Sequence, residues 1–518
     1  MDPTNPLHAV PAERLRVLRD EPLRQDGSYV LHWMTAARRL RSNHALDLSV
    51  ALATSLGKPL VILDSLRCDY PHASDRLHAF VLQGMAERAQ ALEGREGVLH
   101  HPFVETEVGG GKGLLARLAQ EACAVVTDDW PCGFHPRMLE AAARQVAAPL
   151  YAVDSCGLLP VRLGGKAFAR AHDFRRHLQR TLPSVLTDAP APDPLESVAL
   201  PPLRALDEEV TRRWPRATAE LLAASPAALA RLPIDHEVAP VGITGGEAEA
   251  RRRLEHFLDE RLAHYGDNRN DVSVPATSEL SPYLHFGQLS THEVLATMAR
   301  REGWHPTTVT PAAHGKREGW WGMSAPAEAY LDQVVTWREV GLNGCQYLPG
   351  YDRYDSLPAW ARTTLAEHAG DARDHLYTVE EFEQGQTHDE LWNAAQNQLR
   401  SEGMMHNYLR MLWGKKVLEW SASPEEASET LVRLNDRYAL DGRDPNSYAG
   451  IFWTFGRYDR AWGPERPVFG KIRFMSSDNT RRKMRVDAYI ERYAGEGTQL
   501  GLFSASRRQG SSSGARKA

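Results

Sequence analysis

The stretch LWNAAQNQLRSEGMMHNYLRMLWGKKVLEW, residues 391–420, predicts two helices joined by a tight turn. Apolar residues recur at helical spacing on both sides of the SEG string at 401–403, which favours a helix stop. Trp413 and Trp420 are two turns apart, so they share one helix face about 10 Å apart. A hairpin at the stop would bring Trp392 beside Trp413. Three neighbouring indoles could carry electrons, although aromatic residues at this spacing more often fill a core.

Helical periodicity continues on both sides of this stretch and dominates the second half of the chain. The helices expected there are 247–263, 292–301, 326–339, 391–400, 404–420 and 424–435. In the first half, short β-rich runs alternate with helical stretches, which is typical of a Rossmann-like parallel sheet covered by helices. The expected strands are 29–34, 59–64, 98–103, 124–128 and 150–154. The fold class is therefore an α/β domain followed by an all-helical domain.

Changes in composition predict the domain boundaries. Residues 187–244 are rich in proline and alanine, which indicates a long interdomain linker containing one helix. We therefore expect an α/β domain at 1–186 and a helical domain at 245–495. Residues 496–518 are basic and rich in serine and glycine, so we expect a disordered tail.

The overall composition of the 518 residues is that of a soluble globular protein, with 42% hydrophobic and 25% charged residues and a mean hydropathy of −0.45. No apolar run approaches the ~18 residues of a membrane-spanning helix, and the first 20 residues lack the apolar core of a secretory signal. We expect a cytoplasmic location and no membrane partner. The five cysteines are scattered without a Cys-x-x-Cys pair, so we expect no metal site.

Charge and tryptophan are unevenly distributed along the chain. The net charge is −6, yet residues 457–485 hold nine Lys or Arg against three Asp or Glu. In this segment cations alternate with aromatic residues, the composition of a groove that holds phosphates and stacks bases; a solvated face is the simpler alternative. Ten of the thirteen tryptophans lie between Trp304 and Trp462. This density is high for packing alone and is a first indication of function.

The segment YGDNRNDVSVPATSELSPYLHFG, residues 265–287, has the features of an anion site. Ser281, followed by proline, fits an N-cap whose helix end would present free N–H groups. Thr277 and Ser278 offer hydroxyls and Arg269 a guanidinium. A diphosphate could bind there, and ordinary helix capping is the alternative.

The segment LNDRYALDGRDPNSYAGIFW, residues 434–453, brings a carboxylate and two amides near the second helix. Asp441 lies in a turn-forming string, where it can pair with Arg410. Asn435 and Asn446 can both donate and accept, as the edge of a heterocycle such as a flavin requires. Surface capping is an equally good reading of either asparagine.

Taken together, these segments resemble the photolyase/cryptochrome family, and specifically the class II cyclobutane pyrimidine dimer photolyases. The resemblance rests on SELSPYLHFGQ, THDELWNAAQ, GMMHNYLRMLWGKKVLEW, LNDRYALDGRDPN and RPVFGKIRFM, which follow one another over some 200 residues. WMTAARRLRSNHAL, at 33–46, is similar to the opening strand, turn and helix of that class.

The resemblance implies an FAD cofactor, active in its fully reduced anionic form. The residues implied near its phosphates and ribitol are Tyr265, Arg269, Thr277, Ser278, Leu280 and Ser281. Those implied near the isoalloxazine are Asn407, Arg410 and Asp441, with Asn435 at the flavin N5 atom and Asn446 as the alternative. Trp413, Trp392 and Trp420, in that order from the flavin to the surface, are implied to form the electron-transfer chain.

The implied reaction is light-driven splitting of cyclobutane pyrimidine dimers in ultraviolet-damaged DNA, after the dimer has been flipped out of the duplex. Trp453 would stack on the dimer, Glu339 would hydrogen-bond a thymine and Met411 would line the pocket. Trp337 is the candidate for a second stacking aromatic. The expected DNA contacts are Lys471, Arg473, Arg481 and Arg482.

Several questions stay open on the sequence alone. An antenna chromophore of the deazaflavin or folate type would sit against the amino-terminal domain, but no residue identifies it. Residues 303–328 look like an insertion without an assigned role. A cryptochrome-type photoreceptor and a 6-4 photoproduct photolyase are the alternative functions. The latter needs a histidine as proton donor, but the class II resemblance implies His406 equally, so His406 does not favour it. We expect a monomer.

Overall fold

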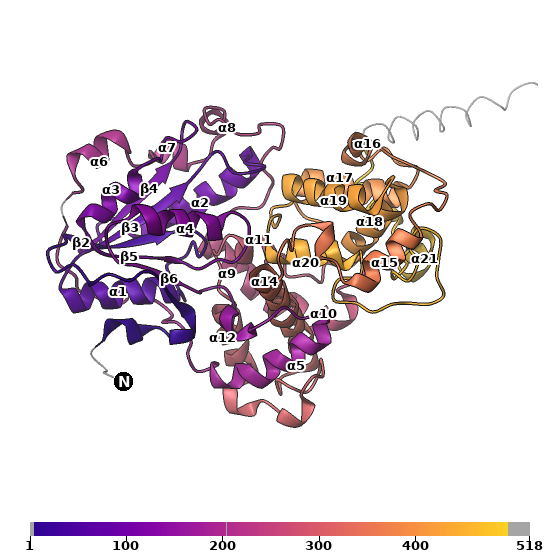
Figure 1. Cartoon of the computed structure of the whole chain (residues 1–518), viewed down its shortest axis with the longest axis horizontal. Coiled ribbons are helices and arrows are strands. Elements are labelled where there is room, and N and C mark those ends of the chain that lie inside the picture. The colour runs from indigo at the N-terminus through magenta and orange to yellow at the C-terminus, as the bar shows by residue number, and fades with distance from the viewer. Residues whose placement is uncertain (1–4, 204, 496–518) are drawn as a thin grey trace, which may run out of the picture. The chain divides into compact units, whose positions relative to one another are not determined.

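The computed structural model describes residues 5–203 and 205–495, which divide into two compact units. Unit 1 comprises the described residues of Met1–Gly266 together with Thr277–Tyr351 and Arg443–Ala449. Unit 2 comprises Asp267–Ala276, Asp352–Gly442 and the described residues of Gly450–Ala518. Figure 1 labels many of the elements of the two units. The tail predicted to be disordered, 496–518, lies outside the described residues.

Unit 1 is built on a six-stranded sheet with the strand order β1-β6-β5-β2-β3-β4. The strands are β1 Leu15–Arg19, β2 Tyr29–Met34, β3 Leu60–Leu66, β4 Val98–Val104, β5 Ala122–Asp128 and β6 Leu150–Val153. The five expected strands are present and pair in parallel. The sixth, β1, was not expected, and it pairs antiparallel to β6. This edge strand carries two arginines and is only half-buried, so it lacks the apolar signal of the central strands.

The two faces of the sheet are covered by different helices because successive side chains of a strand point to opposite faces. Val30 and Met34 of β2 pack in one core with α1, His44–Leu56. Leu31 and Trp33 pack in a second core with α3, Leu114–Glu121, and α4, His135–Gln145. In Figure 1, α1 lies below the sheet and α3 above it. The burial of both faces explains why the strands read as continuous apolar runs.

The proline-rich segment 187–244 is packed against the sheet in unit 1. It contains three short helices, α6 Glu208–Arg213, α7 Ala219–Leu222 and α8 Pro226–Leu229, rather than the one expected. Leu200 belongs to the core on the α1 side, and Trp214 to the core on the other side. The Trp214 indole donates to the carbonyl of Gly110 at 3.0 Å. Buried apolar side chains therefore hold this segment in place.

The remaining helices of unit 1 cluster after residue 244. They are α9 Glu247–His256, a π-helical turn Phe257–Arg261, α10 Leu262–Asn268, α11 Ser281–His285, α12 Thr291–Glu302, α13 Ala325–Leu331, a π-helical turn Asp332–Trp337 and α14 Arg338–Tyr347. The last two residues of α10 belong to unit 2. Before them in the chain come α2 Asp75–Ala91 and α5 Ala171–Thr181. Within 303–328, Trp320 and Trp321 are buried and their rings lie 4.8 Å apart. This segment therefore has a small aromatic core of its own.

Unit 2 is built from helices. They are α15 Ala359–Glu367, α16 Val379–Gln384, α17 Glu390–Glu402, α18 Asn407–Trp420, α19 Pro424–Tyr438, α21 Ser477–Lys483 and α22 Asp487–Arg492, with α20 Pro445–Trp453 beginning in unit 1. Helix α17 ends at Gly403, whose φ of 68° is left-handed, so the predicted helix stop is confirmed. No helix of the described residues combines the length and apolarity needed to cross a bilayer.

Trp214 offers a test of how firmly the proline-rich segment is held. We expect Trp214→Ala to lower the free energy of unfolding of unit 1 by about 3–5 kcal/mol, because it empties a buried indole site, and to speed proteolysis within 187–244. Denaturant titration and limited proteolysis measure the two effects. Arg212→Ala, at an exposed position of α6 just before Trp214, is the control. Equal proteolysis of both variants would contradict the anchoring role.

Candidate functional site

Three indoles lie in contact in unit 2, where α17 and α18 form the predicted hairpin. The rings of Trp392 and Trp413 are nearly parallel, with 6.4 Å between centroids and 9° between planes. The ring of Trp420 lies 6.1 Å from that of Trp392 at 66°. Trp392, which comes from the other helix, therefore lies between the two tryptophans of α18. The hairpin thus creates a continuous aromatic row from residues up to 28 positions apart in sequence.

Buried hydrogen bonds hold the two inner indoles. The Trp392 Nε1 atom donates to the Trp413 carbonyl at 3.0 Å, across the hairpin. The Trp413 Nε1 atom donates to Oε1 of Gln396 at 3.0 Å, and the Gln396 amide donates to the carbonyl of Glu383 at 3.2 Å. An indole has one donor and no acceptor, so each ring is satisfied in one orientation. These bonds go beyond what core packing requires and keep the stacking geometry constant.

The third indole differs from its expected position at the surface. Trp420 is only 3% exposed. The ring of Tyr377 lies 5.8 Å from it, that of His388 lies 4.9 Å away, and the Lys416 ammonium lies 5.2 Å above its face. The reason is that the chain between α15 and α17 folds over the end of α18. The aromatic row therefore continues beyond Trp420, which the helical spacing did not reveal.

An ion pair lies one helical turn before Trp413. Arg410 of α18 donates to Asp441 at 3.1 Å, as the sequence predicted, and both side chains are less than 20% exposed. The other Arg410 amino group lies 3.5 Å from Oδ1 of Asn435 on α19. The Asn435 amide donates to Asp436 at 3.1 Å. A cation, a carboxylate and an amide thus converge in unit 2, which is a suitable donor and acceptor set for the edge of a flavin.

His406, which precedes α18, has unused hydrogen-bonding capacity. Both its ring nitrogens are buried without a hydrogen-bond partner in the described part of the chain. Burial lowers the pKa of this imidazole to about 4, so the ring is neutral at pH 7. Its neighbour Asn407 begins α18 and is exposed. Buried polar atoms without partners are costly, so a bound polar group beside His406 fits this end of the helix.

The predicted phosphate segment lies in unit 1, apart from Arg269, which belongs to unit 2. Tyr265 is buried against Tyr330, with 5.3 Å between ring centroids. Ser278 hydrogen-bonds the Tyr330 hydroxyl. Ser281 is the first residue of α11 and makes no capping bond, and the preceding position is taken by the buried Leu280. The N-cap expected at Ser281 is therefore wrong, and the five-residue α11 is too short to act as an anion site by itself.

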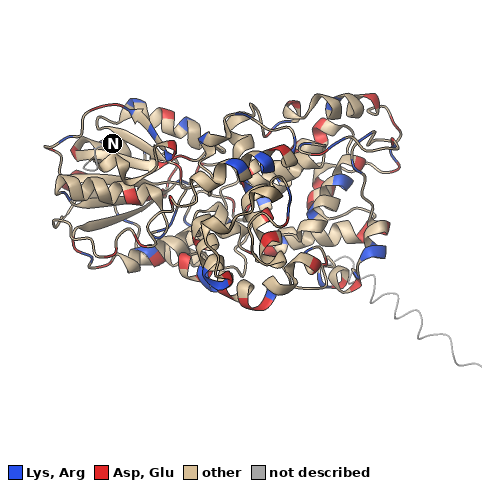
Figure 2. Ribbon diagram, turned by 90° about the horizontal axis from the view of Figure 1, so that it is seen from below, with Lys and Arg blue, Asp and Glu red and all other residues tan. Residues whose placement is uncertain are grey.

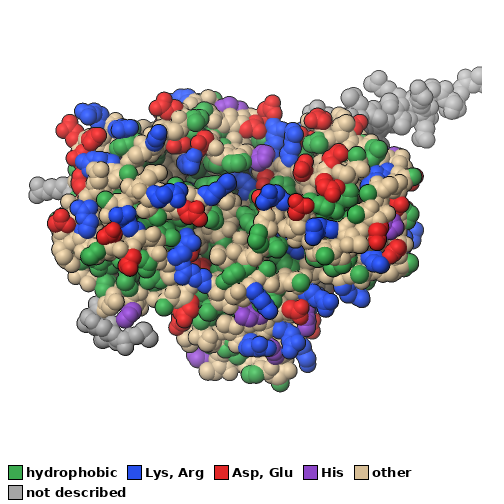
Figure 3. Space-filling view, viewed as in Figure 1, with side chains coloured by type: hydrophobic (Ala, Val, Ile, Leu, Met, Phe, Trp, Pro, Cys, Tyr) green, Lys and Arg blue, Asp and Glu red, His purple; other side chains and the backbone are tan. Residues whose placement is uncertain are grey.

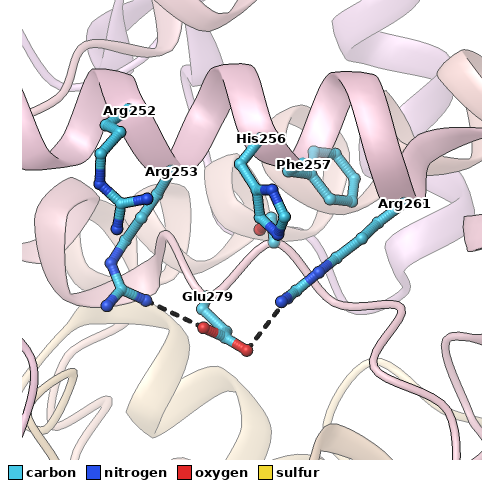
Figure 4. A pocket seen from close by; sticks show the side chains of 7 residues that line it. Arg252, Arg253, His256, Phe257, Arg261 and Glu279 are labelled. Atoms are coloured by element: carbon cyan, nitrogen blue, oxygen red, sulfur yellow. Dashed lines mark hydrogen bonds and ion pairs between the residues drawn. The ribbon is translucent and has the colours of Figure 1, made fainter.

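A pocket of about 240 Å³ lies beside this segment, between α9 with its π-helical turn and the loop at 277–280 (Figure 4). It is lined by Arg252, Arg253, His256, Phe257, Arg261, Ser278 and Glu279. The Glu279 carboxylate accepts from Arg253 at 2.9 Å and from Arg261 at 3.1 Å. Arg261 also donates to the Thr277 carbonyl at 2.9 Å. These cations hold the loop, and hence Thr277 and Ser278, in a defined conformation.

Glu339 does not occupy the role expected from the sequence. It is 3% exposed, and its two carboxylate oxygens accept from the backbone amides of Leu158 and Leu159 at 2.7 and 3.1 Å. Burial raises the pKa of this carboxyl to about 7. Unit 1 therefore uses the carboxylate as an anchor for the loop after β6. Trp337, at the end of the preceding π-helical turn, is half-buried.

Trp453 lies close to two basic side chains in unit 2, of which Lys415 has its pKa lowered to about 7 by burial. The Lys415 ammonium lies 5.1 Å from its ring and the Arg473 guanidinium 5.4 Å. Arg473 also stacks on Trp462 at 4.0 Å and pairs with Asp459 at 2.9 Å. Trp453 itself is half-buried. Cation–π contacts orient its indole and leave part of the ring accessible.

The other expected contact residues of unit 2 vary in their surroundings. Lys471 is exposed and pairs with Glu465 at 2.9 Å. Arg481, in the last turn of α21, lies 3.8 Å from Glu390. The next residue, Arg482, is exposed. Met411 is half-buried. Asn446 is exposed and belongs to unit 1. Arg481 and Arg482 carry the charge of α21 into solvent, whereas Arg473 is bound in the aromatic cluster.

Comparison with curated proteins shows similarity over nearly the whole chain, although no family model matches. The deoxyribodipyrimidine photo-lyase of Methanothermobacter thermautotrophicus is 34% identical over 485 residues, which cover 93% of this chain and 98% of that protein. The proteins of the same name from Potorous tridactylus and Oryza sativa subsp. japonica are 33% and 34% identical, over 92% and 91% of this chain and 83% and 89% of theirs. The chain belongs to the deoxyribodipyrimidine photo-lyase family.

The fold of this photolyase agrees with a solved structure. A bacterial class III photolyase from Agrobacterium tumefaciens matches with a TM-score of 0.61 at 17% identity, over 90% of this chain and 86% of that one. The expected combination of an α/β sheet domain and a helical part is confirmed.

Charges of both signs are mixed over the surface of the photolyase. Figure 2 shows Lys and Arg interspersed with Asp and Glu along the helices, and on the face in Figure 3 basic and acidic side chains alternate. The net charge of −6 therefore gives no sign of a strongly basic molecule.

The burial of Glu339 predicts how the free energy of unfolding depends on pH. Its pKa rises from an ordinary 4.5 to about 7 on folding, so the folded protein binds more protons than the unfolded chain between these values. The free energy of unfolding therefore falls as the pH rises from 4.5 to 7. A shift of one pKa unit corresponds to about 1.4 kcal/mol, so the expected loss is roughly 3 kcal/mol.

We expect Glu339→Gln to make the free energy of unfolding less dependent on pH over this range, as measured by urea titration at several pH values. Glu425→Gln, at the start of α19 in unit 2, is the matched control. An unchanged pH dependence in Glu339→Gln would contradict this assignment.

Proposed function

We propose that this photolyase is a class II enzyme that splits cyclobutane pyrimidine dimers in ultraviolet-damaged DNA, with fully reduced anionic FAD as its cofactor. The observation that carries the proposal is the indole row that begins one turn after the Arg410–Asp441 pair. Trp392 lies between Trp413 and Trp420, which is the order that the class II resemblance implied. The named activity of the relatives that align with the whole chain supports the same reaction.

The cofactor proposal rests on groups in both units, each taken separately. In unit 2, the Arg410–Asp441 pair, Asn435 and Asn407 would hold the ring system, and Arg269 would contact the phosphates. His406 has ring nitrogens without a hydrogen-bond partner among the described residues. Asn435 is the proposed partner of the flavin N5 atom, since its amide already lies beside Arg410; Asn446 is the alternative. In unit 1, Tyr265, Thr277, Ser278, Leu280 and Ser281 would hold the phosphates and ribitol. When bound and excited by light, reduced FAD supplies the electron that opens the dimer and takes it back afterwards.

The indole row serves to restore the reduced cofactor rather than to act in each turnover. Trp413 is the inner member, because it shares α18 with Arg410, and Trp392 follows it in ring contact. Electron transfer between rings in contact needs no movement of the protein. The buried hydrogen bonds of both indoles keep the ring separations constant.

Recognition of the lesion is proposed to centre on Trp453. A dimer inside the duplex must be flipped out, and its poor stacking lowers the cost of extrusion. The accessible part of the half-buried Trp453 ring can stack on the flipped bases, while Lys415 and Arg473 orient the ring. Met411 and Trp337 remain proposed pocket residues, and Lys471, Arg473, Arg481 and Arg482 proposed DNA contacts. Glu339 is left out because its carboxylate is bound to backbone amides within unit 1.

The remaining expectations are proposals of the same kind. We propose a monomer that acts on DNA in the cytoplasm, with an antenna chromophore of the deazaflavin or folate type against the amino-terminal domain. Purified protein that absorbs as a flavoprotein and, under blue light, restores dimer-containing oligonucleotide would support dimer repair. Restoration of 6-4 photoproducts alone, or a flavin signal without repair, would favour the 6-4 photolyase or the cryptochrome instead.

Trp413→Phe tests the electron-transfer row. We expect light-driven reduction of the oxidised flavin to slow by at least about tenfold, because phenylalanine is much harder to oxidise than tryptophan. Repair by chemically pre-reduced enzyme should stay nearly unchanged. Transient absorption and a repair assay measure the two rates. Trp360→Phe, in unit 2 but outside the row, is the control, and equal slowing in both variants would refute the assignment.

Trp453→Ala tests the stacking proposal. We expect binding to dimer-containing DNA to weaken by about 1–3 kcal/mol through the lost stacking, with little change for undamaged DNA of the same sequence. Fluorescence anisotropy at fixed salt measures both affinities. The same loss on both DNAs would show that Trp453 contributes to general binding only.

A further inference from the structure

The aromatic row of unit 2 continues past Trp420 into a tyrosine and two histidines that the proposed function does not use. The ring of Tyr377 lies 5.8 Å from Trp420, and the Tyr377 backbone N–H donates to the Trp420 carbonyl at 3.1 Å. His388 lies 4.9 Å from Trp420 and stacks on His375 at 3.7 Å. Tyr377 is half-buried, whereas both histidines are exposed. The row therefore reaches solvent through these three side chains.

The Tyr377 hydroxyl makes two hydrogen-bond contacts with His388. The oxygen accepts from the backbone N–H of His388 at 3.0 Å. Its other contact is the Nδ1 atom of His388 at 2.7 Å. When the imidazole carries its proton on Nε2, Nδ1 is free of a proton and accepts the phenol hydrogen. In this tautomer the phenol–imidazole pair has the geometry of a general base in contact with its acid.

We propose that Tyr377 and His388 form the outer end of the electron-transfer row, where Tyr377 gives up an electron and His388 takes its proton. This inference rests on the proposed function of Trp413, Trp392 and Trp420. It adds a redox-active tyrosine and a proton acceptor to a row that the sequence predicted to end at Trp420.

The step balances within these residues and one light-excited oxidised flavin as electron acceptor. Loss of one electron from the indole row leaves Trp420 as a radical cation. One electron passes from the Tyr377 phenol to Trp420, the Tyr377 O–H bond breaks, and the proton binds Nδ1 of His388. The products are neutral Trp420, a neutral tyrosyl radical and an imidazolium. An external thiol can then reduce the radical at this accessible position.

Coupling the two transfers has a physical reason. An oxidised phenol is a strong acid, so a base in hydrogen-bond contact makes its oxidation far more favourable than electron loss alone. Once the proton is on His388, the electron cannot return from the flavin without recovering that proton as well. The pair therefore favours lasting charge separation over recombination.

The surroundings of His388 keep it ready to accept a proton. Partial burial, followed by the neighbouring His375, lowers the pKa of the His388 imidazole, so the ring is neutral at pH 7. Lys416 acts in the same direction, whereas Asp389 and Glu419 act against it. The proton acceptor is therefore available at neutral and higher pH, and it is lost as the pH falls through the His388 pKa.

The first experiment identifies the radical. Flavin-loaded protein containing ring-deuterated tyrosine is illuminated, frozen and examined by electron paramagnetic resonance. We expect a tyrosyl spectrum that narrows on deuteration and disappears in Tyr377→Phe, leaving a tryptophan radical. Tyr354→Phe, which alters a tyrosine outside the row, should retain it. A tyrosyl signal that survives Tyr377→Phe, or only a tryptophan signal in the parent protein, would overturn the proposal.

The second experiment concerns the proton acceptor. We expect His388→Gln, which keeps an oxygen acceptor but no base, to reduce the tyrosyl yield at pH 8 by at least about fivefold. In the parent protein the yield should fall with decreasing pH at the His388 pKa, as measured independently by nitrogen-15 NMR of histidine. His375→Gln should raise that pKa and shift the yield curve to higher pH. A yield that does not follow the NMR titration would refute the role of His388.

The two experiments separate this inference from the function on which it rests. If the parent protein forms no radical in light and Trp413→Phe changes nothing, the electron-transfer row itself is wrong. If light produces a tryptophan radical that depends on Trp413 but no tyrosyl radical, the row stands and the Tyr377–His388 extension fails. The NMR titration reports the state of His388 without any flavin chemistry.

Discussion

The bond between the Trp392 indole and the Trp413 carbonyl is the constraint on which the arrangement of unit 2 depends. It crosses from α17 to α18, so it sets the register of the hairpin as well as the orientation of one ring. Through Gln396 the same network reaches the carbonyl of Glu383, near the end of α16. Because these groups are buried, a slip of the hairpin would leave several polar atoms without partners. The ring separations follow from that register.

Unit 1 uses buried charge for a comparable purpose. Arg14, which is 1% exposed, donates to the carbonyls of Asp154, Gly157 and Leu158, and Glu339 accepts from the amides of Leu158 and Leu159. The Arg14 and Glu339 side chains therefore both hydrogen-bond the backbone of the loop after β6. Another conformation of this loop would leave the buried Arg14 amino groups and Glu339 oxygens without these backbone partners, which is costly. A side chain with the sequence context of a substrate ligand is used here for structure.

The proposed chemistry makes modest demands on the protein, because a flavin would carry out the difficult electron transfer. The protein holds three groups in fixed places. They are the stacked indoles, the Arg410–Asp441 ion pair one turn away, and Trp453 beside Lys415 and Arg473. The Tyr377–His388 pair would add control of one proton. The two inner indoles and the ion pair are held by buried or partly buried hydrogen bonds, which is how a site stays rigid.

The sequence by itself determined much of this protein, and its limits have physical causes. Apolar runs predicted the five parallel strands, and Gly403 predicted the hairpin, because burial on both faces and a left-handed helix end each require particular residues. The loop position of Asp441 predicted its pair with Arg410. Other features depend on which surfaces meet. The edge strand β1 is stabilised by pairing rather than by its side chains. Glu339 was assigned to a lesion by its local string, yet its partners come from residues 180 positions away. Whether Trp420 is exposed, and that Tyr377 lies against it, depends on how a distant segment folds over the helix end. The spacing of residues along the sequence determines helices, strands and turns. Which side chains pack against one another is decided only when the chain is folded.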